Sequence, residues 1–219
     1  CAALGQELLV LLGLVSMGTA AVFIIGQQDY KRLLAYSSVE HIGILALGVG
    51  LGGAGVFGSM LHAVNHSLTK AMLFLVAGNL LAVYNSKSCR DVRGALRVMP
   101  FSAALWIAGF LAITGSPPFG PFLSEFAIVL SGFQSGHPGL AGGLLLLLLV
   151  VFVGMGATVL GMVQGEAPAD IPPGSWREGL PTLLPPALLM ALVLWLGLQI
   201  PPPVARLLED AVRFLEGVP

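Results

Sequence analysis

The chain has 219 residues, of which 56% are hydrophobic and only 10% are charged, with a formal net charge of −1 and a mean hydropathy of +0.91. Soluble domains carry about 25% charged residues, so this composition excludes an ordinary soluble enzyme and indicates a chain that lies in lipid. No basic cluster has the density that nucleic acid requires, so no nucleic-acid partner is expected. The two cysteines, Cys1 and Cys89, have neither metal-ligand nor redox spacing and predict no disulfide framework.

The chain begins at Cys1, and no basic segment precedes the first apolar run, which argues against a signal peptide. A lipid-modified terminal cysteine is one alternative. We favour a chain cut from a longer protein, because the first hydrophobic segment begins almost at once.

Uninterrupted apolar segments predict five membrane-crossing helices, since about 20 apolar residues span a bilayer. In chain order they lie at 8–26, 33–52, 55–84, 140–163 and 182–200. The segment 164–181 reads as a polar, proline-rich loop. The tail 204–216 alternates apolar and charged residues at helical spacing and predicts a short amphipathic helix at the membrane interface.

Two shorter apolar segments, 100–114 and 122–133, flank the sequence GSPPFGP at 115–121. Adjacent prolines with flanking glycines cannot continue a helix, because proline lacks the backbone N–H and its ring clashes with the preceding turn. Neither piece is comfortably long enough to cross alone. We therefore expect one discontinuous crossing over 100–134, whose unwound part is buried in protein or lines a cavity. The fold class is all-α, a polytopic membrane bundle of about six crossings.

Basic residues orient this bundle. They gather in the loops 27–32 and 85–99, whereas the short loop near 52–56 has none. The positive-inside tendency makes the basic side cytoplasmic. If 100–134 crosses once, the loop 164–181 is also cytoplasmic and the tail lies outside. If its two pieces each cross, those two assignments reverse, and the sequence alone leaves this open.

The segment 55–84 carries His62, His66 and Lys70 within apolar sequence. Their spacing of four residues places them on one stripe of a helix, drifting by about 80° over roughly 12 Å. A lysine at the bilayer centre costs roughly 3 kcal/mol or more, so it faces the bundle interior or a hydrated cavity. The stripe predicts a path for protons or ions.

Two other interpretations of this stripe are structural hydrogen bonding and a zinc site shared by the two histidines. The zinc site is disfavoured because HAVNH lacks the glutamate of HExxH and no third ligand is near in the sequence. No metal is therefore predicted.

Glu125 follows the proline-glycine break, where free backbone groups and water can stabilise a charge. It can also act as a structural acid at the start of the next helix, whose dipole favours an anion.

Glu40 and His41 are adjacent and so project about 100° apart on a helix. They need not contact each other. The predicted proton path comprises Lys70, His66, His62, Glu125, Glu40 and His41.

Three motifs carry a family resemblance: DYKRLLAYSSVEHIGILALG, HAVNHSLTKAMLFL and ITGSPPFGPFLSEFAIV. They resemble the antiporter-like membrane subunits of respiratory complex I, multisubunit cation/proton antiporters and membrane-bound hydrogenases. The combination most resembles hydrogenase-4 component F, of the formate hydrogenlyase type. The resemblance covers roughly residues 8–165.

The resemblance implies two inverted five-helix repeats, each with a discontinuous helix. Residues 1–163 look like the second repeat, and 164–219 like a cytoplasmic loop, a final transmembrane helix and the tail. The first repeat, which in the family supplies a glutamate–lysine pair, is absent. Lys70 matches a central relay lysine with His66 and His62 beside it, and Glu125 matches the end-point of the half-channel.

These features predict a proton-translocating fragment of a redox-driven complex of the group 4 hydrogenase or NADH-quinone oxidoreductase type. The alternative is a subunit of a cation/proton antiporter without a redox partner. The expected partners are the lipid bilayer, other membrane subunits and the missing N-terminal half. No cofactor is expected in this chain, which is placed as a multi-pass protein in the inner cell membrane.

Overall fold

The computed structural model describes residues 2–171 and 177–216, which form nine helices and no strand. The helices are α1 (Ala2–Ile24), α2 (Tyr30–Leu51), α3 (Ala54–Tyr84), α4 (Ala95–Val98), α5 (Pro100–Ile113), α6 (Gly120–Gln134), α7 (Pro138–Val163), α8 (Leu180–Leu198) and α9 (Pro202–Glu216). The expectations for Cys1 and for 172–176 of the polar loop lie outside the described residues.

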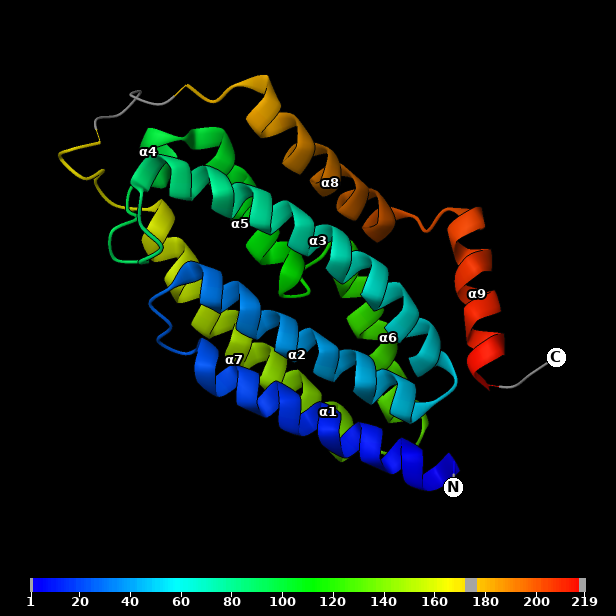
Figure 1. Ribbon diagram of the computed structural model, residues 1–219. Coiled ribbons are helices and arrows are strands. Elements are labelled where there is room, and N and C mark those ends of the chain that lie inside the picture. The colour runs from blue at the N-terminus through cyan, green and yellow to red at the C-terminus, as the bar shows by residue number, and fades with distance from the viewer. Residues whose placement is uncertain (1, 172–176, 217–219) are drawn as a thin grey trace.

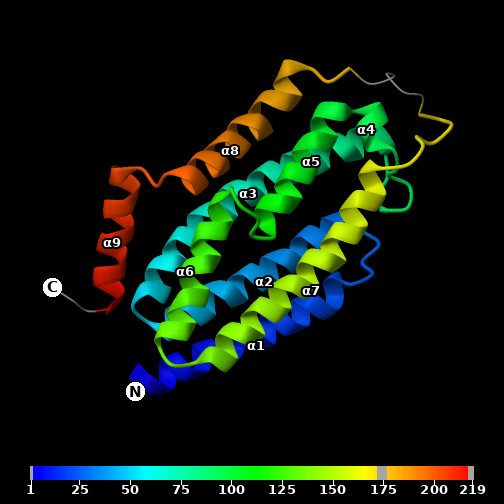
Figure 2. The same ribbon diagram turned by 180° about the vertical axis from the view of Figure 1, so that it is seen from behind.

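Helix α3 is the centre of the bundle. It packs against α2, α5, α6 and α8, while α1 packs against α2 and α7. Figure 1 shows α1, α2, α3 and α8 side by side, and Figure 2 shows α7, α5 and α6 across the back of that layer. A side chain on the inner face of α3 is therefore surrounded by protein.

Five helices, α1, α2, α3, α7 and α8, are long and apolar enough to cross a membrane. Their bounds lie within a few residues of those expected from the apolar segments, except that α1 begins earlier. The one-turn helix α4 was not predicted. It interrupts the basic loop after α3, and Gly94 precedes it with a φ of 62°.

The predicted break is present. Helix α5 ends at Ile113 and α6 begins at Gly120, so 114–119 is unwound. The 14 and 15 residues of these helices span only about 21 and 22 Å each, less than the roughly 30 Å of a bilayer core. Figure 2 shows them following one another through the bundle as one discontinuous crossing.

Protein packs against part of this unwound segment: Pro117 and Pro118 are exposed in the described chain, and the other four residues are half-buried. A Cβ added to Gly197 of α8 would collide with the backbone carbonyl of Pro118. One added to Gly120 would collide with the side-chain oxygen of Asn65 on α3. Helices α3 and α8 therefore approach the break too closely for larger side chains at either glycine.

The loops after α1, α3 and α7 meet at one end of the bundle (Figure 1). Tyr30 N donates to Lys87 O (3.1 Å), and Gly94 N donates to Gln164 O (2.9 Å). The start of the 164–181 loop thus lies on the same side as both basic loops. The structure agrees with the alternative in which 100–134 crosses once.

Carboxylates cap two helices at this end. Asp29 accepts hydrogen bonds from two backbone N–H groups at the start of α2, at 2.8 and 3.0 Å. Glu178 accepts from the N–H groups of Phe101 (2.9 Å) and Ser102 (2.7 Å) at the start of α5. Such bonds satisfy donors that a helix leaves free in its first turn.

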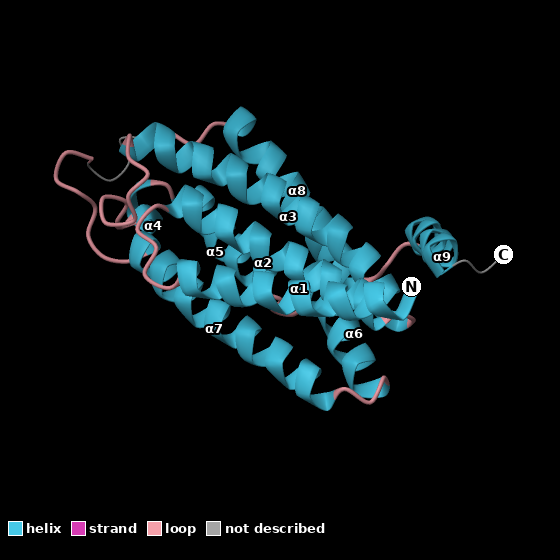
Figure 3. Ribbon diagram, turned by 60° about the horizontal axis from the view of Figure 1, so that its bottom comes forward, coloured by secondary structure: helices cyan, strands magenta, loops and turns pink. Residues whose placement is uncertain are grey.

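Helix α9 lies at the opposite end, set apart from the bundle (Figure 3) and touching α3. Leu208 is buried, whereas Leu207 and Phe214 are 70% and 85% exposed. The expected amphipathic tail is thus a helix, and its position at a membrane interface stays a prediction.

Two apolar clusters fill the interior. The larger cluster lies toward the basic loops and includes Trp106, Met72 and Met155; the smaller lies toward the other end and includes Met17 and Ile128. Along α2, Leu34 belongs to the first cluster and Ile44 to the second. The polar residues between them on this helix therefore form a layer at mid-depth.

Glycines allow α1 and α2 to pack in direct backbone contact. A Cβ on Gly13 would lie 2.7 Å from the Gly43 carbonyl oxygen.

We expect Gly13→Ala to lower the unfolding free energy by about 1–3 kcal/mol, because overpacking forces the helices apart. The loss is measured as a lower melting temperature of the purified protein. Gly18 of α1 has nothing within 4 Å of its added Cβ, so Gly18→Ala should be neutral or stabilising, by up to about 1 kcal/mol. Equal melting shifts for both variants would contradict this packing.

Candidate functional site

The six residues of the predicted path gather from three helices. Glu40 and His41 lie on α2, His62, His66 and Lys70 on α3, and Glu125 on α6. All are buried except His66, which is half-buried. Burial of so many titratable groups costs free energy unless each finds partners, so their contacts determine what the cluster can do.

Histidines connect α2 to α3. His41 Nδ1 and His62 Nε2 are hydrogen bonded at 2.8 Å. The rings of His41 and His66 lie 4.6 Å apart between centroids. The sequence left open which of Glu40 and His41 faces α3, and His41 is the one that meets both histidines.

Lys70 is held separately from the histidines. Its Nζ donates hydrogen bonds to the carbonyl of Leu34 and the hydroxyl of Ser37, both on α2. Glu40 is close enough to interact electrostatically with Lys70. The stripe of three predicted residues therefore divides between a histidine group and a lysine group that share α2.

Ser124 fixes the direction of the histidine hydrogen bonds. Its hydroxyl donates its one hydrogen to Pro121 O (2.8 Å), so it can only accept from His62 Nδ1, at 2.9 Å. With both rings neutral, His62 Nε2 then accepts from His41 Nδ1. The remaining nitrogen, His41 Nε2, then carries a lone pair, and the Ile113 backbone lies close to the His41 ring.

Glu125 lies beside Ser124, next to the break. It is 5% exposed, and one donor atom from each of His41, His62 and Glu125 lies within 4.8 Å of the others. The carboxylate also lines a largely apolar cavity of about 330 Å³ between α6 and α7. The break thus brings an acid to the end of the histidine row.

Several buried polar atoms of this layer have no hydrogen-bond partner within the described part of the chain. They are His41 Nε2, both amide atoms of Asn65, His66 Nδ1 and Glu125 Oε1. Buried groups of this kind are usually satisfied by ordered water. The site is therefore suited to water bridging between its histidines and its acid.

Comparison with known proteins assigns this chain to a family. Residues 3–155 match the family model described as "NADH:quinone oxidoreductase/Mrp antiporter, TM". The chain belongs to this family. Its members in the comparison are subunits of multisubunit membrane complexes, and this chain is a multi-pass membrane protein.

Two relatives and two solved structures illustrate the likeness. The chain is 38% identical over 170 residues to "Hydrogenase-4 component F homolog" of Methylacidiphilum infernorum, covering 76% of this chain and 35% of the relative. It is 32% identical over 212 residues to "NADH-quinone oxidoreductase subunit M" of Mycobacterium tuberculosis, covering 95% of this chain and 37% of the relative.

Among solved structures, a chain of respiratory complex I from Thermus thermophilus superposes with a TM-score of 0.85 at 28% identity, over 99% of this chain and 45% of that one. A chain of the Mrp complex from Dietzia superposes with a TM-score of 0.81 at 21% identity, over 97% and 47%, and shows the fold alone. The chain spans about a third of the length of these curated relatives.

The structure corrects the expectation that no third metal ligand is near the histidines. The group His41, His62 and Glu125 has a donor set that zinc accepts, drawn from three helices rather than from the HAVNH pair. Both nitrogens of His62 are already hydrogen bonded. A shared ion would have to replace one of those bonds, so the contacts of the described residues favour proton transfer over metal binding.

Sequence reasoning missed two residues of this candidate site. Ser124 ends the row of hydrogen bonds, and Asn65 aims an unpartnered amide at the break. An asparagine inside an apolar helix is a detectable signal, because an amide in lipid needs partners. Ser124 gives no such signal, since a hydroxyl can bond within its own helix.

Gly115 allows Glu125 its position. A Cβ there would collide with Glu125 Oε2. Gly136 offers a matched control, because both glycines have positive φ, 65° and 77°, but nothing lies within 4 Å of a Cβ on Gly136. We expect both alanine variants to lose about 1 kcal/mol from backbone strain, and Gly115→Ala to lose about 1–3 kcal/mol more from displacement of the acid. Thermal unfolding of the two variants measures this difference, and equal losses would contradict the contact.

Proposed function

We propose that this chain carries part of the route by which protons cross the inner cell membrane within a redox-driven complex. The observation that supports this best is the row of buried groups running from Lys70 and Glu40 through the three histidines to Glu125. Charges and imidazoles in lipid are costly and mark ion or proton pathways. Electron transfer would take place in other subunits.

The hydrogen bonds suggest how one proton moves. A proton that reaches His41 Nε2 makes that ring a cation, which releases its Nδ1 proton to His62 Nε2 along the 2.8 Å bond. His62 holds its own Nδ1 proton against Ser124. The proton on His62 Nε2 then passes through an intervening water molecule to the nearby Glu125 carboxylate, which leaves His62 neutral with its Nδ1 proton in place.

Lys70 and Glu40 would supply the charge that drives this step. The ammonium is held by Leu34 and Ser37 next to Glu40. Protonating or deprotonating Lys70 changes the electrostatic potential at the histidines, which lie one and two helical turns away on α3. The lysine thus acts as a relay whose state favours or opposes a proton on His41.

The chain would supply only half of a complete route. In this proposal residues 1–163 are the second inverted repeat, with the broken helix as its half-channel, and 164–219 are a cytoplasmic loop, the final crossing and the tail. The first repeat, with its glutamate–lysine pair, would belong to the rest of the subunit. The short span relative to the relatives supports this division.

Neutral substitutions test the path. In the complete complex, Lys70→Met and Glu125→Gln should lower the rate of proton uptake at a given rate of electron transfer by about a hundredfold, the lower end of what positioned acid–base groups contribute to a rate. Uptake is measured with a pH-sensitive dye in sealed vesicles while the complex transfers electrons. Both replacements approximate the shape of the native side chain, so assembly on a native gel should be unchanged.

The exposed residues Lys87 and Glu209 provide controls of the same charge. Lys87→Met and Glu209→Gln should leave the proton-to-electron ratio as in the wild type. Normal pumping by both path variants would refute the proposal, even if the antiporter family assignment stands.

A cation/proton antiporter without redox partner is the second candidate, favoured by the family description, which names the Mrp antiporter. A sodium gradient imposed on vesicles in the absence of electron transfer separates the two. We expect no sodium-driven pH change, because the described path contains no cluster of oxygen ligands typical of a sodium site. A pH change that Glu125→Gln abolishes would support the antiporter instead.

A further inference from the structure

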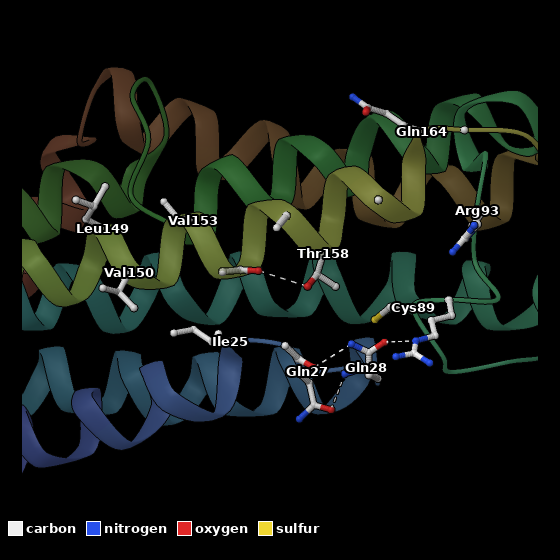
Figure 4. A pocket seen from close by; sticks show the side chains of 16 residues that line it. Ile25, Gln27, Gln28, Cys89, Arg93, Leu149, Val150, Val153, Thr158 and Gln164 are labelled. Carbon is white, nitrogen blue, oxygen red and sulfur yellow. Dashed lines mark hydrogen bonds between the residues drawn. The ribbon is translucent and has the colours of Figure 1, made fainter.

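A long groove lies on the outer side of the bundle, away from the polar layer (Figure 4). It has a volume of about 970 Å³ and runs between the end of α1, the loop after α3 and the second half of α7. The proposed proton route uses none of its residues. Its lining changes in character along its length.

The end toward the middle of the membrane is apolar. Figure 4 shows Ile25, which directly follows α1, opposite Leu149, Val150 and Val153 of α7. Farther along, small residues keep the floor open: Gly154, Ala157 and Gly161 follow one another on α7. Because Gly161 has nothing within 4 Å of an added Cβ, the described chain leaves this part unfilled.

The other end is polar and basic. Arg90 and Arg93 line it together with Gln27, Gln28 and Gln164, and the labelled members gather at that end in Figure 4. Both arginines are exposed, and they stand just beyond the ends of α1 and α7, at the level where a membrane helix meets water. The Arg90 side chain is oriented by a hydrogen bond to Gln28 Oε1 (2.9 Å).

No acidic side chain lines the groove in the described part of the chain. Asp91, Glu166 and Asp170 line a neighbouring hollow that shares the two arginines. The thiol of Cys89 also lines the groove, and burial raises its pKa to about 11. A thiol with that pKa stays neutral at physiological pH, so the two arginines are the charged side chains that line the groove in the described chain, and the three acids face the neighbouring hollow.

An apolar trough in the membrane with paired arginines at its interfacial end matches one chemistry. Phospholipids present an acyl chain and a phosphate in this order, and arginine binds phosphate through paired N–H groups. A transmembrane helix would fill the apolar part equally well. It would give no reason for two arginines at the end, so the charge favours lipid.

We propose that this groove binds an anionic phospholipid, with an acyl chain against α7 between Leu149 and Gly161 and the phosphate at Arg90 and Arg93. The lipid would complete the packing of α1 against α7 at the basic end of the bundle. This proposal is independent of the proton route.

Lipid retention by the purified full-length subunit tests the site. The subunit is equilibrated in detergent with equal amounts of dioleoyl phosphatidylglycerol and dioleoyl phosphatidylcholine, and bound lipid is counted by native mass spectrometry. Wild type should retain the anionic lipid preferentially. Arg90→Gln with Arg93→Gln should lower its retention by about fivefold for each arginine removed and leave phosphatidylcholine unchanged. Arg97→Gln, an exposed arginine outside the groove, should have no effect.

Filling the apolar end provides a second arm that keeps both arginines. Gly161→Leu should lower retention of both lipids, because its side chain occupies the trough. Gly142→Leu is the matched control, since Gly142 is also on α7, is also free of contacts within 4 Å, and lies outside the groove. Neither position is packed within the described chain, so both variants should fold normally.

Three outcomes would overturn the proposal. Unchanged retention of phosphatidylglycerol in the double arginine variant excludes the phosphate contact. Displacement of the bound lipid by millimolar inorganic phosphate, with no loss in Gly161→Leu, indicates a site for free phosphate. In an Ala157→Cys variant, a photoreactive label is attached to the new thiol. If this label cross-links to another protein segment instead of to lipid, a helix fills the groove.

Discussion

Burial of charge in a lipid-embedded bundle is the constraint on which the rest of this structure depends. Lys70, Glu40 and Glu125 are each less than 10% exposed, and water is not freely available to them at mid-depth. Polar groups of α2 stabilise Lys70: the carbonyl of Leu34 and the hydroxyl of Ser37 accept hydrogen bonds from its ammonium. Each such contact requires a helix to sit in one rotation and no other.

The break between α5 and α6 determines where another buried charged group lies. It ends one helix and starts another at mid-depth, and Glu125 lies in the second turn of that new helix. Helices α3 and α8 pack closely on the break at Gly120 and Pro118, which covers part of the unwound segment and leaves Pro117 and Pro118 partly open. The two apolar clusters on either side confine the polar groups to one layer.

The two faces of α7 line two different kinds of hollow. On one side, Leu145 and Leu148 of α7 line the cavity beside Glu125. Toward the outside, its small residues leave a trough that ends at arginines. A proton path needs groups whose hydrogen bonds are incomplete, so that a proton has somewhere to go. A lipid site needs apolar surface and a fixed charge at the interface.

The sequence by itself determined the helices, the broken crossing and the identity of the buried titratable residues. A 3.6-residue period, the length of a bilayer crossing and the cost of charge in lipid are local properties that the residue order carries. Only the tertiary structure decided that His41 meets His62, that Lys70 turns to Ser37, and that Glu125 joins two histidines. Those pairings depend on how far each helix is rotated and shifted against its neighbours, and many distant contacts together set that rotation. The short helix α4 and the caps by Glu178 were unpredictable for the same reason, because their partners lie far away in the chain.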